Sequence, residues 1–319
     1  GPALGPTIGG IILHITTWHW IFMINVPFGI IGVIIACLLI PTPPKMQTPV
    51  PFNWLGFVLF SVGLSLVTLS MAVLGDNFEW LKLSMILGAG AVILLAVYVH
   101  LSLKQTNPML DLNLFKQKTF RIAMIVNFLP RIGIGATPFL MALLLQVLWG
   151  RSALFSGSIF IFLALGMMST RIFVNQTLLW RYGYRNVMLV VSSLLSIISM
   201  NLCWFSTPKP YWLLGLIMFV IGVLTSQLYM SVGTLYPSGL ERSQFSQGTS
   251  IASTIQQFSM GFGVACAAIS LHLIAKLSHL PLFSSTIFFW TFIGLNLIGA
   301  TSIFFIVQLD RDAGRKAKT

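Results

Sequence analysis

The residue of this sequence best suited to do chemistry is Arg131, a charged side chain inside the long apolar run 120–148. It follows Arg121 by ten residues, which corresponds to about 15 Å along a helix axis. Asn127 lies one helical turn earlier on the same face. A cation at such a depth is costly and usually faces a bundle interior or an aqueous cavity. We therefore expect Arg131 to have a functional or gating role, with a purely structural role as the alternative.

The acidic residues do not supply a partner for Arg131. All six of them lie outside the apolar runs, namely Asp76, Glu79, Asp111, Glu241, Asp310 and Asp312. We therefore expect the partner of Arg131 to lie outside this chain. A membrane enzyme would need His, acidic or Ser–base residues gathered at one depth. The positions of the acids exclude that class, and no spacing of cysteines and histidines is typical of a metal site.

The elements that must position Arg131 are membrane-spanning helices. Of the 319 residues, 56% are hydrophobic and 8% are charged, whereas soluble domains carry roughly 25% charged residues. Apolar stretches of about 20 residues recur along the sequence, each long enough to cross a hydrocarbon core. Because these runs are continuous rather than alternating, they indicate helices and not the strands of a barrel. The sequence therefore predicts an all-α polytopic membrane protein.

The apolar runs between polar breaks predict ten helical segments. They cover residues 1–15, 21–40, 54–73, 83–103, 120–148, 153–177, 187–206, 211–236, 250–275 and 284–308. The first is too short to be a complete span, so the chain is expected to begin within a membrane helix. The run 120–148 is long enough to need a tilt or a break, which Pro130 and Pro138 can provide.

Basic residues predict how the spans are oriented. The net charge is +12, but the Lys and Arg side chains are spread over loops without a dense tract, which excludes a nucleic-acid partner. One side of the membrane collects twelve of them, including those of the C-terminal tail, and the other side collects four. By the positive-inside rule the richer side is cytoplasmic. We expect an integral protein of a bacterial cytoplasmic (inner) membrane with a cytoplasmic C-terminus.

The first ten residues fit the pattern G-x-x-x-G-P-x-x-G-G, formed by Gly1, Gly5, Pro6, Gly9 and Gly10. This pattern resembles the antiporter motif in the fifth helix of drug:proton antiporters of the major facilitator superfamily. The following string from Trp18 to Gly29 resembles the junction after that helix in the fourteen-helix branch. "NPMLDLNLFKQKTFRIA" resembles the entry to that branch's C-terminal half, and "QGTSIASTIQQFSMGFGVA" is similar to its thirteenth helix. The resemblance covers essentially the whole chain.

One motif departs from the family pattern. Arg181, Gly183 and Arg185 match the superfamily's cytoplasmic loop motif G-x-x-x-D-R-x-G-R, whereas Gln176 and Trp180 replace its glycine and its acid. The copy of this motif in the C-terminal half is often degenerate in the family. We therefore interpret the three matching residues as a remnant of the loop motif.

The resemblance implies a major facilitator fold lacking its first four helices. Residues 1–40 would be the last part of the N-terminal six-helix half, with helices five and six. Residues 41–104 would form two additional linker transmembrane helices, 105–309 the C-terminal six-helix half, and 310–319 a basic cytoplasmic tail. Gly1, Gly5 and Gly9 recur every four residues and are expected to pack closely against 153–177, where Gly157 and Gly166 suit the contact.

The resemblance also implies a function, which is proton-coupled efflux of drugs or other amphiphilic compounds by alternating access. Such a protein needs no cofactor besides the proton gradient. Its partners would be the lipid bilayer, a small-molecule substrate, the proton and a missing N-terminal segment. The helices expected to line the C-half cavity are 120–148 and 211–236. The candidate cavity residues on them are Asn127, Arg131, Gln146, Gln227 and Tyr229, with Thr225, Ser226, Phe128, Phe139 and Phe219 as further polar and aromatic candidates.

Two alternatives to drug efflux stay open. One is a transporter of another small solute, such as an amino acid or a siderophore, because the sequence does not identify the substrate. The other is a truncated, non-transporting remnant of such a transporter. The aspartate that the family carries in its first helix is absent from residues 1–319. These residues alone are therefore not expected to couple export to proton entry.

Overall fold

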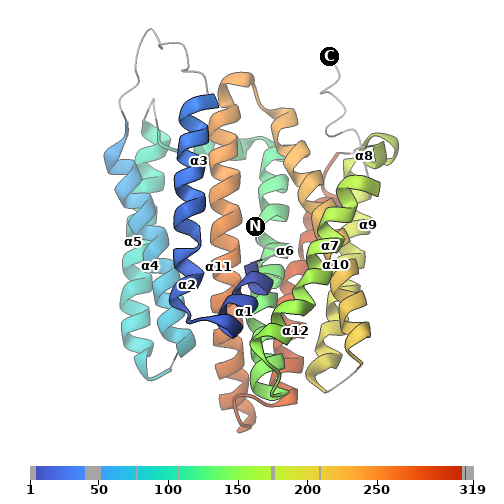
Figure 1. Cartoon of the computed structure of the whole chain (residues 1–319). Helices are drawn as coiled ribbons and strands as arrows, with labels where there is room; N and C mark the ends of the chain where they lie inside the picture. The colour runs from blue at the N-terminus through green and yellow to red at the C-terminus, as the bar shows by residue number, and fades with distance from the viewer. Residues whose placement is uncertain are drawn as a thin grey trace.

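The protein is described here by a computed structural model that covers residues 5–39, 52–76, 78–105, 108–173, 177–207, 210–310 and 313. Every regular element within these ranges is a helix (Figure 1). Nine helical segments of the described chain are long and apolar enough to cross a membrane. The predicted all-α polytopic membrane protein is thus confirmed.

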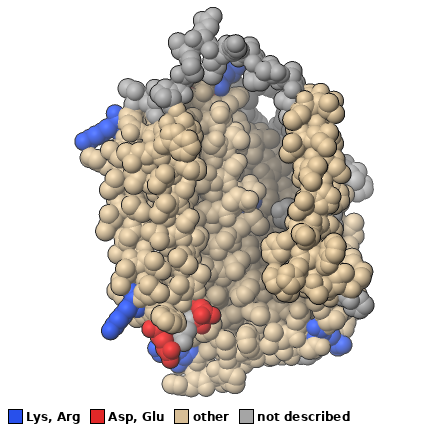
Figure 2. Space-filling view, turned by 60° about the vertical axis from the view of Figure 1, so that its left-hand side comes forward, with Lys and Arg blue, Asp and Glu red and all other residues tan. Residues whose placement is uncertain are grey.

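The N-terminal part consists of α1 (Gly5–Ile15), α2 (His19–Met23) and α3 (Asn25–Leu39), of which α2 and α3 together form one membrane span. α3 packs mainly on α2, and none of its residues is buried. Figure 2 shows a hollow on this face of the molecule, beside the apolar column of the N-terminal helices. α3 is therefore an apolar helix whose sides are largely uncovered by the rest of the described chain.

The next two helices, α4 (Trp54–Asp76) and α5 (Leu81–Lys104), pair side by side as a hairpin. Two buried serines join them near the connection between the helices, Ser70 in the last two turns of α4 and Ser84 in the first turn of α5. Ser70 Oγ donates to the Ser84 carbonyl over 2.7 Å, and Ser84 Oγ donates to the Ser70 carbonyl over 2.8 Å. Because apolar surface alone does not drive helices together in lipid, such hydrogen bonds help to define the pair. α4 also packs against α11, which attaches the hairpin to the C-terminal bundle.

The remaining helices form the C-terminal bundle, in which α6 and α11 pack together centrally (Figure 1). In chain order they are α6 (Lys118–Leu143), α7 (Ala153–Phe173), α8 (Thr177–Tyr182), α9 (Tyr184–Met200), α10 (Tyr211–Leu235), α11 (Phe245–Ser278), α12 (Ser285–Ala300) and α13 (Ser302–Val307). Half of the membrane-spanning part of α6 is buried. The bundle, rather than the N-terminal helices, therefore holds most of the core.

The structure adds local detail to two of the predicted spans. α6 continues through Pro130 and Pro138, and the helix first changes at a π-helical turn over Leu144–Leu148. Pro130 is buried with the backbone of Gly299 packed against it, so neighbouring helices hold the chain where the proline removes a hydrogen bond. The predicted span 284–308 corresponds to one membrane-length segment, Ser285–Val307, within which the helix is interrupted at Thr301 between α12 and α13. A prediction from hydropathy alone does not detect such local changes.

Close helix crossings in the bundle depend on glycines. A Cβ atom on Gly135 of α6 would lie 2.8 Å from the Met260 carbonyl oxygen of α11, and one on Gly263 of α11 would collide with the Ile132 carbonyl of α6. α7 and α10 cross in the same way, with Gly166 against Phe219 and Gly222 against Leu163. Small residues at these positions let the two backbones approach.

On the face seen in Figure 2, charged side chains lie at the two ends of the molecule. Blue side chains are visible at the upper and lower ends and red ones at the lower end, with a broad band of mostly uncharged surface between them. This distribution matches a protein whose middle section faces hydrocarbon.

Candidate functional site

A polar cluster lies at the middle of α6, where the sequence predicted it. Arg131 is buried, with 4% of its surface exposed. Its Nε donates a hydrogen bond to Asn127 Oδ1 over 2.9 Å, one turn earlier on α6. Asn127 in turn donates from Nδ2 to the Ala252 carbonyl of α11 over 3.0 Å. The pair therefore fixes the Arg131 side chain and connects α6 to α11.

Tyr229 of α10 completes the cluster. The guanidinium carbon of Arg131 lies 3.4 Å from the centroid of the Tyr229 ring, a cation–π arrangement that is favourable where water is excluded. Within the described residues, neither Arg131 Nη1 nor the buried Tyr229 hydroxyl has a hydrogen-bond partner. The cluster thus joins α6, α10 and α11 and still offers two unused polar groups.

Asn127 and Tyr229 both contact Arg131, so the side chain has neutral partners within the chain, while a charged partner outside it stays a prediction. The prediction considered carboxylates only, whereas an amide oxygen and an aromatic face also stabilise a guanidinium. Both partners are neutral, so they do not cancel the charge. Arg131 therefore remains a buried cation that can attract an anionic or oxygen-bearing group.

The other two predicted cavity residues do not join this cluster. Gln227 is buried, and neither atom of its amide has a hydrogen-bond partner in the described chain. It is two residues from Tyr229 and so lies on a different face of α10. Gln146 is exposed in the π-helical turn at the end of α6. Thr225, one turn before Tyr229, shares the face of Tyr229, and its buried hydroxyl is also without a partner there.

Aromatic side chains lie beside the polar cluster. Phe128 of α6 packs against two rings of α11, with centroid distances of 6.2 Å to Phe258 and 5.7 Å to Phe262. Because Phe128 is three residues from Arg131, the two project from neighbouring positions on α6. An apolar surface next to a buried cation and two free polar groups can bind an amphiphilic molecule, but it holds no nucleophile paired with a base.

A hollow of ≈ 500 Å³ lies between α4, α6 and α11. Its walls are mostly apolar and include Phe139, one of the aromatic residues predicted to line a pocket, together with Phe283. Asp76 and His272 are its two titratable lining residues. A hollow of this volume is within the range of small-molecule pockets.

The predicted seam between the glycine-rich first helix and 153–177 is confirmed, since α1 packs against α7. Of the motif residues predicted for this interface, Gly10 is in the contact, and Gly5 and Gly9 are not. A Cβ atom on Gly10 would lie 2.8 Å from the Ala153 carbonyl oxygen, whereas one on Gly5 or Gly9 would meet nothing within 4 Å. The four-residue spacing predicts one face of a helix, but the face turned toward α7 is the one that carries Gly10.

Four further residues of the seam prediction have different outcomes. Gly1 lies outside the described residues, and Pro6 is in α1 with its side chain outside them. Gly157 is buried in α7. Gly166 serves the crossing of α7 with α10 and not the contact with α1.

The remnant of the cytoplasmic loop motif forms the turn between α8 and α9. Gly183 has φ of 81° and precedes the first residue of α9, and only glycine adopts such a backbone without strain. Arg181 is exposed and lies over the Tyr182 ring at 5.6 Å, while Arg185 is half-buried. Gln176 is outside the described residues.

Sequence reasoning missed two kinds of polar group. The Ala252 carbonyl, which accepts from Asn127, is a backbone atom and leaves no signal in residue type. A second polar group was detectable, because Ser192, Ser196 and Ser199 recur on one face of α9. Together with Asn296 they line a separate cavity inside the bundle.

Comparison with known proteins identifies the family of this chain. Residues 1–264 match the family model described as Major Facilitator Superfamily. The chain is 32% identical over 316 residues to "Putative multidrug resistance protein MdtD" of Escherichia coli O6:H1 (strain CFT073), Escherichia coli (strain K12) and Shigella boydii serotype 18. The match covers 98% of this chain and 66% of each relative, so the chain spans just under two thirds of their length. The chain therefore belongs to the Major Facilitator Superfamily, a family of transporters and not of enzymes.

Proposed function

We propose that this protein exports drugs or other amphiphilic compounds by alternating access and that proton entry drives the export. The observation that carries the proposal is the Arg131 cluster. It places a buried cation, without a carboxylate partner in the described chain, where α6, α10 and α11 meet. In a major facilitator fold, helices equivalent to α6 and α10 would line the central cavity.

Two further observations support an amphiphilic substrate. The relatives that cover most of this chain are named as multidrug resistance proteins. The ≈ 500 Å³ hollow beside Phe139 has mostly apolar walls with few polar groups, which suits a molecule that is largely apolar with one polar or charged end.

The α1–α7 seam supports alternating access. α1 approaches α7 through Gly10, near the start of α7. We infer that this contact seals the outer end of the cavity and sets how it opens, since tightly crossing helices can rock as rigid units. The proton would compete with the substrate for a carboxylate, and the proton gradient would be the energy source in place of any cofactor.

The distribution of basic residues supports a location in a bacterial cytoplasmic membrane with the C-terminus in the cytoplasm. Lys104, Lys116 and Arg242 lie at one end of their helices, and Lys82 and Lys276 at the other. The proposed organisation follows the same topology. Residues 1–40 belong to one half, 41–104 to the linker hairpin and 105–309 to the other half, with 310–319 as the tail.

The proposal is tested in proteoliposomes that contain the complete gene product and a pH-sensitive dye in the lumen. Under an imposed proton gradient, adding a cationic, a neutral or an anionic amphiphile should cause proton flux that saturates with substrate concentration. An uncoupler should abolish accumulation of the compound on the far side. If none of the three classes changes the proton flux or is moved across the membrane, drug–proton antiport is contradicted.

A further inference from the structure

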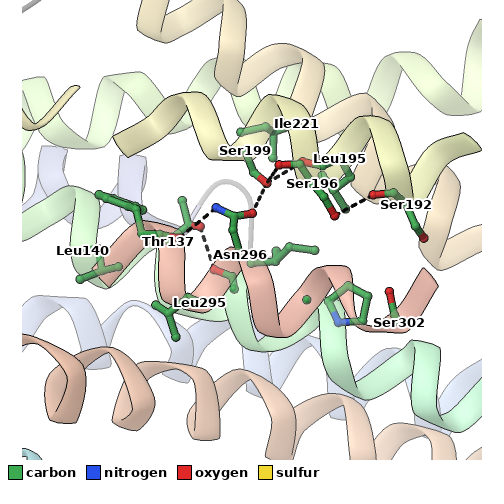
Figure 3. A pocket seen from close by; sticks show the side chains of 15 residues that line it. Thr137, Leu140, Ser192, Leu195, Ser196, Ser199, Ile221, Leu295, Asn296 and Ser302 are labelled. Atoms are coloured by element: carbon green, nitrogen blue, oxygen red, sulfur yellow. Dashed lines mark hydrogen bonds between the residues drawn. The ribbon is translucent and has the colours of Figure 1, made fainter. Parts of the chain in front are cut away.

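A second polar region lies inside the C-terminal bundle, on a face of α6 different from that of Arg131. Ser192, Ser196 and Ser199 project from α9 toward α12, and Ser199 Oγ is hydrogen-bonded to Asn296 Oδ1 (Figure 3). Asn296 Nδ2 donates to the carbonyl of Phe292 within its own helix over 3.2 Å. This region thus connects two helices through neutral side chains at the level of the hydrocarbon core.

These side chains surround a small internal cavity of ≈ 30 Å³. Thr137 of α6 and Ser302 of α13 contribute further hydroxyls, so α6, α9, α12 and α13 all supply polar atoms. Apolar side chains complete the lining, namely those of Ile134, Leu140, Leu195, Ile221, Phe292 and Leu295. A cavity that is both internal and rich in hydroxyls is unusual among apolar helices.

Two of the hydroxyls have no hydrogen-bond partner among the described residues. Ser192 is 2% exposed and Ser302 is 0% exposed, and the Oγ atom of each is buried and unpartnered. By contrast, Ser196 Oγ donates to the Ser192 carbonyl over 2.9 Å, and Thr137 Oγ1 donates to the Gly133 carbonyl over 2.9 Å. Buried polar groups in native structures are nearly always hydrogen-bonded, to protein or to ordered water. Ser192 and Ser302 therefore point to a ligand.

We propose that this cavity is a hydration site that holds ordered water between α9, α12 and α13. Its volume of ≈ 30 Å³ accommodates about two water molecules, since each needs roughly 10–15 Å³. Water can donate to and accept from Ser192 Oγ and Ser302 Oγ and can bridge both to the Asn296 amide. The inference does not depend on the transported substrate.

The chemistry of the lining favours water over a cation. The polar side chains that line the cavity are those of serine, threonine and asparagine, and none of the carboxylates in the described part of the chain lines it. A bound Na⁺ would require several oxygen acceptors, and its charge would be uncompensated at that depth. Hydroxyls that can both donate and accept match a neutral ligand that does the same.

X-ray radiolysis of the protein in nanodiscs tests the site, because hydroxyl radicals formed from bound water oxidise the nearest side chains. Phe292 and Leu295 are each 3% exposed and line the cavity, while Phe288 is 0% exposed on the same helix outside it. We expect oxidation of Phe292 and Leu295 to be several-fold faster than that of Phe288. Replacing Ser192→Val, which fills the cavity with methyl groups, should abolish the difference. Equal, slow oxidation of all three residues in the unmodified protein would overturn the proposal.

Thermal unfolding gives an independent readout. If water pairs with Ser192 and Ser302, then Ser192→Val or Ser302→Ala removes one partner and strands the other polar groups, which should lower Tm by a few degrees. If the cavity is dry, removing an unpartnered hydroxyl relieves its desolvation and raises Tm, which contradicts the proposal. Ser259→Val is the matched control, since Ser259 is 0% exposed on α11 and bonded to the Gln256 carbonyl. A Tm of the unmodified protein that rises when Na⁺ replaces choline, and no longer does so in Ser192→Val, would assign the site to a cation instead.

Discussion

α3 and α6 are both apolar helices long enough to contribute a membrane span, yet the chain surrounds them differently. The span that contains α3 is more apolar than the span of α6, but none of it is buried, whereas half of the α6 span is buried. α6 carries Asn127, Arg131 and Gly135, which contact other helices. In lipid, small and polar residues determine which helix faces pack, because apolar side chains are equally satisfied by lipid tails. Hydropathy therefore identifies which segments span the membrane, whereas the small and polar residues within a span determine which other helices pack against it.

The largest loss of stability is expected where the backbones of α6 and α11 cross closely. Replacing Gly263→Leu on α11 would drive a side chain into the Ile132 carbonyl of α6, where backbone cannot yield. We expect a loss of at least about 3 kcal/mol, the upper range for overpacking, and little monodisperse protein in detergent. The measurement is thermal unfolding followed by size-exclusion chromatography.

Gly32→Leu on α3 is the matched control for Gly263→Leu, because a Cβ atom on Gly32 meets nothing within 4 Å. It should leave Tm and the elution profile unchanged. If both variants destabilise the protein equally, the distinction between the packed and the uncovered helix does not hold.

The next largest effect is expected on proton flux when Arg131, the buried charged residue of α6, is replaced. Arg131→Met keeps the volume but removes the donor to Asn127 and the cation over the Tyr229 ring. We expect substrate-driven proton flux to fall by at least about tenfold, which equals roughly 1.4 kcal/mol of lost interaction. Arg131→Lys should restore only part of the flux, since an ammonium lacks the planar fork of the guanidinium.

Arg151→Met provides the control for Arg131→Met. Arg151 is exposed and lies 5.1 Å from the Tyr211 ring centroid, so its removal should leave the flux within experimental error. A wild-type flux in Arg131→Met, with the protein folded and inserted, would assign Arg131 a purely structural role.

The sequence was sufficient for the spans and for the position of Arg131 within one of them, because a long apolar run and a charge within it are visible in residue types alone. It was not sufficient for the partner of Arg131. Tyr229 is nearly a hundred residues away on α10, and although it was predicted as a cavity residue, nothing in the sequence indicated that its ring contacts Arg131. Contacts between distant helices depend on how each helix is rotated. An error of one position moves a residue by about 100° around the helix.

The glycine motif illustrates the same limit. The pattern correctly predicted that α1 packs on α7 and it included Gly10, but its four-residue spacing also selected Gly5 and Gly9, which the contact does not use. Adjacent glycines are equally small, so composition does not decide between them. The packing of the Ala153 backbone against α1 determines which glycine lies in the contact.

A smaller effect is therefore expected at the α1–α7 seam, which among the described residues is the main attachment of the N-terminal helices to the bundle. Gly10→Leu would force a side chain against the Ala153 carbonyl and should separate α1 from α7 while leaving the bundle folded. Hydrogen exchange of the α1 amides should accelerate, with that of α10 unchanged. Gly9→Leu is the control, because its Cβ position is open, and equal acceleration in both variants would refute the assignment of Gly10.

The smallest effect is expected at the charged rim of the bundle. Lys118, the first residue of α6, donates from Nζ to Asp310 Oδ1 over 2.7 Å, but the two side chains are 50% and 70% exposed. Exposed ion pairs contribute about 0.2–1 kcal/mol, so Asp310→Asn should change the free energy of unfolding by no more than about 0.5 kcal/mol, and less at high salt. A larger loss in chemical unfolding would mean that α6 is held by its rim as well as by its buried face. The contrast between α6 and α3 would then reflect where charges can pair, and not only where small and polar residues lie within the hydrocarbon core.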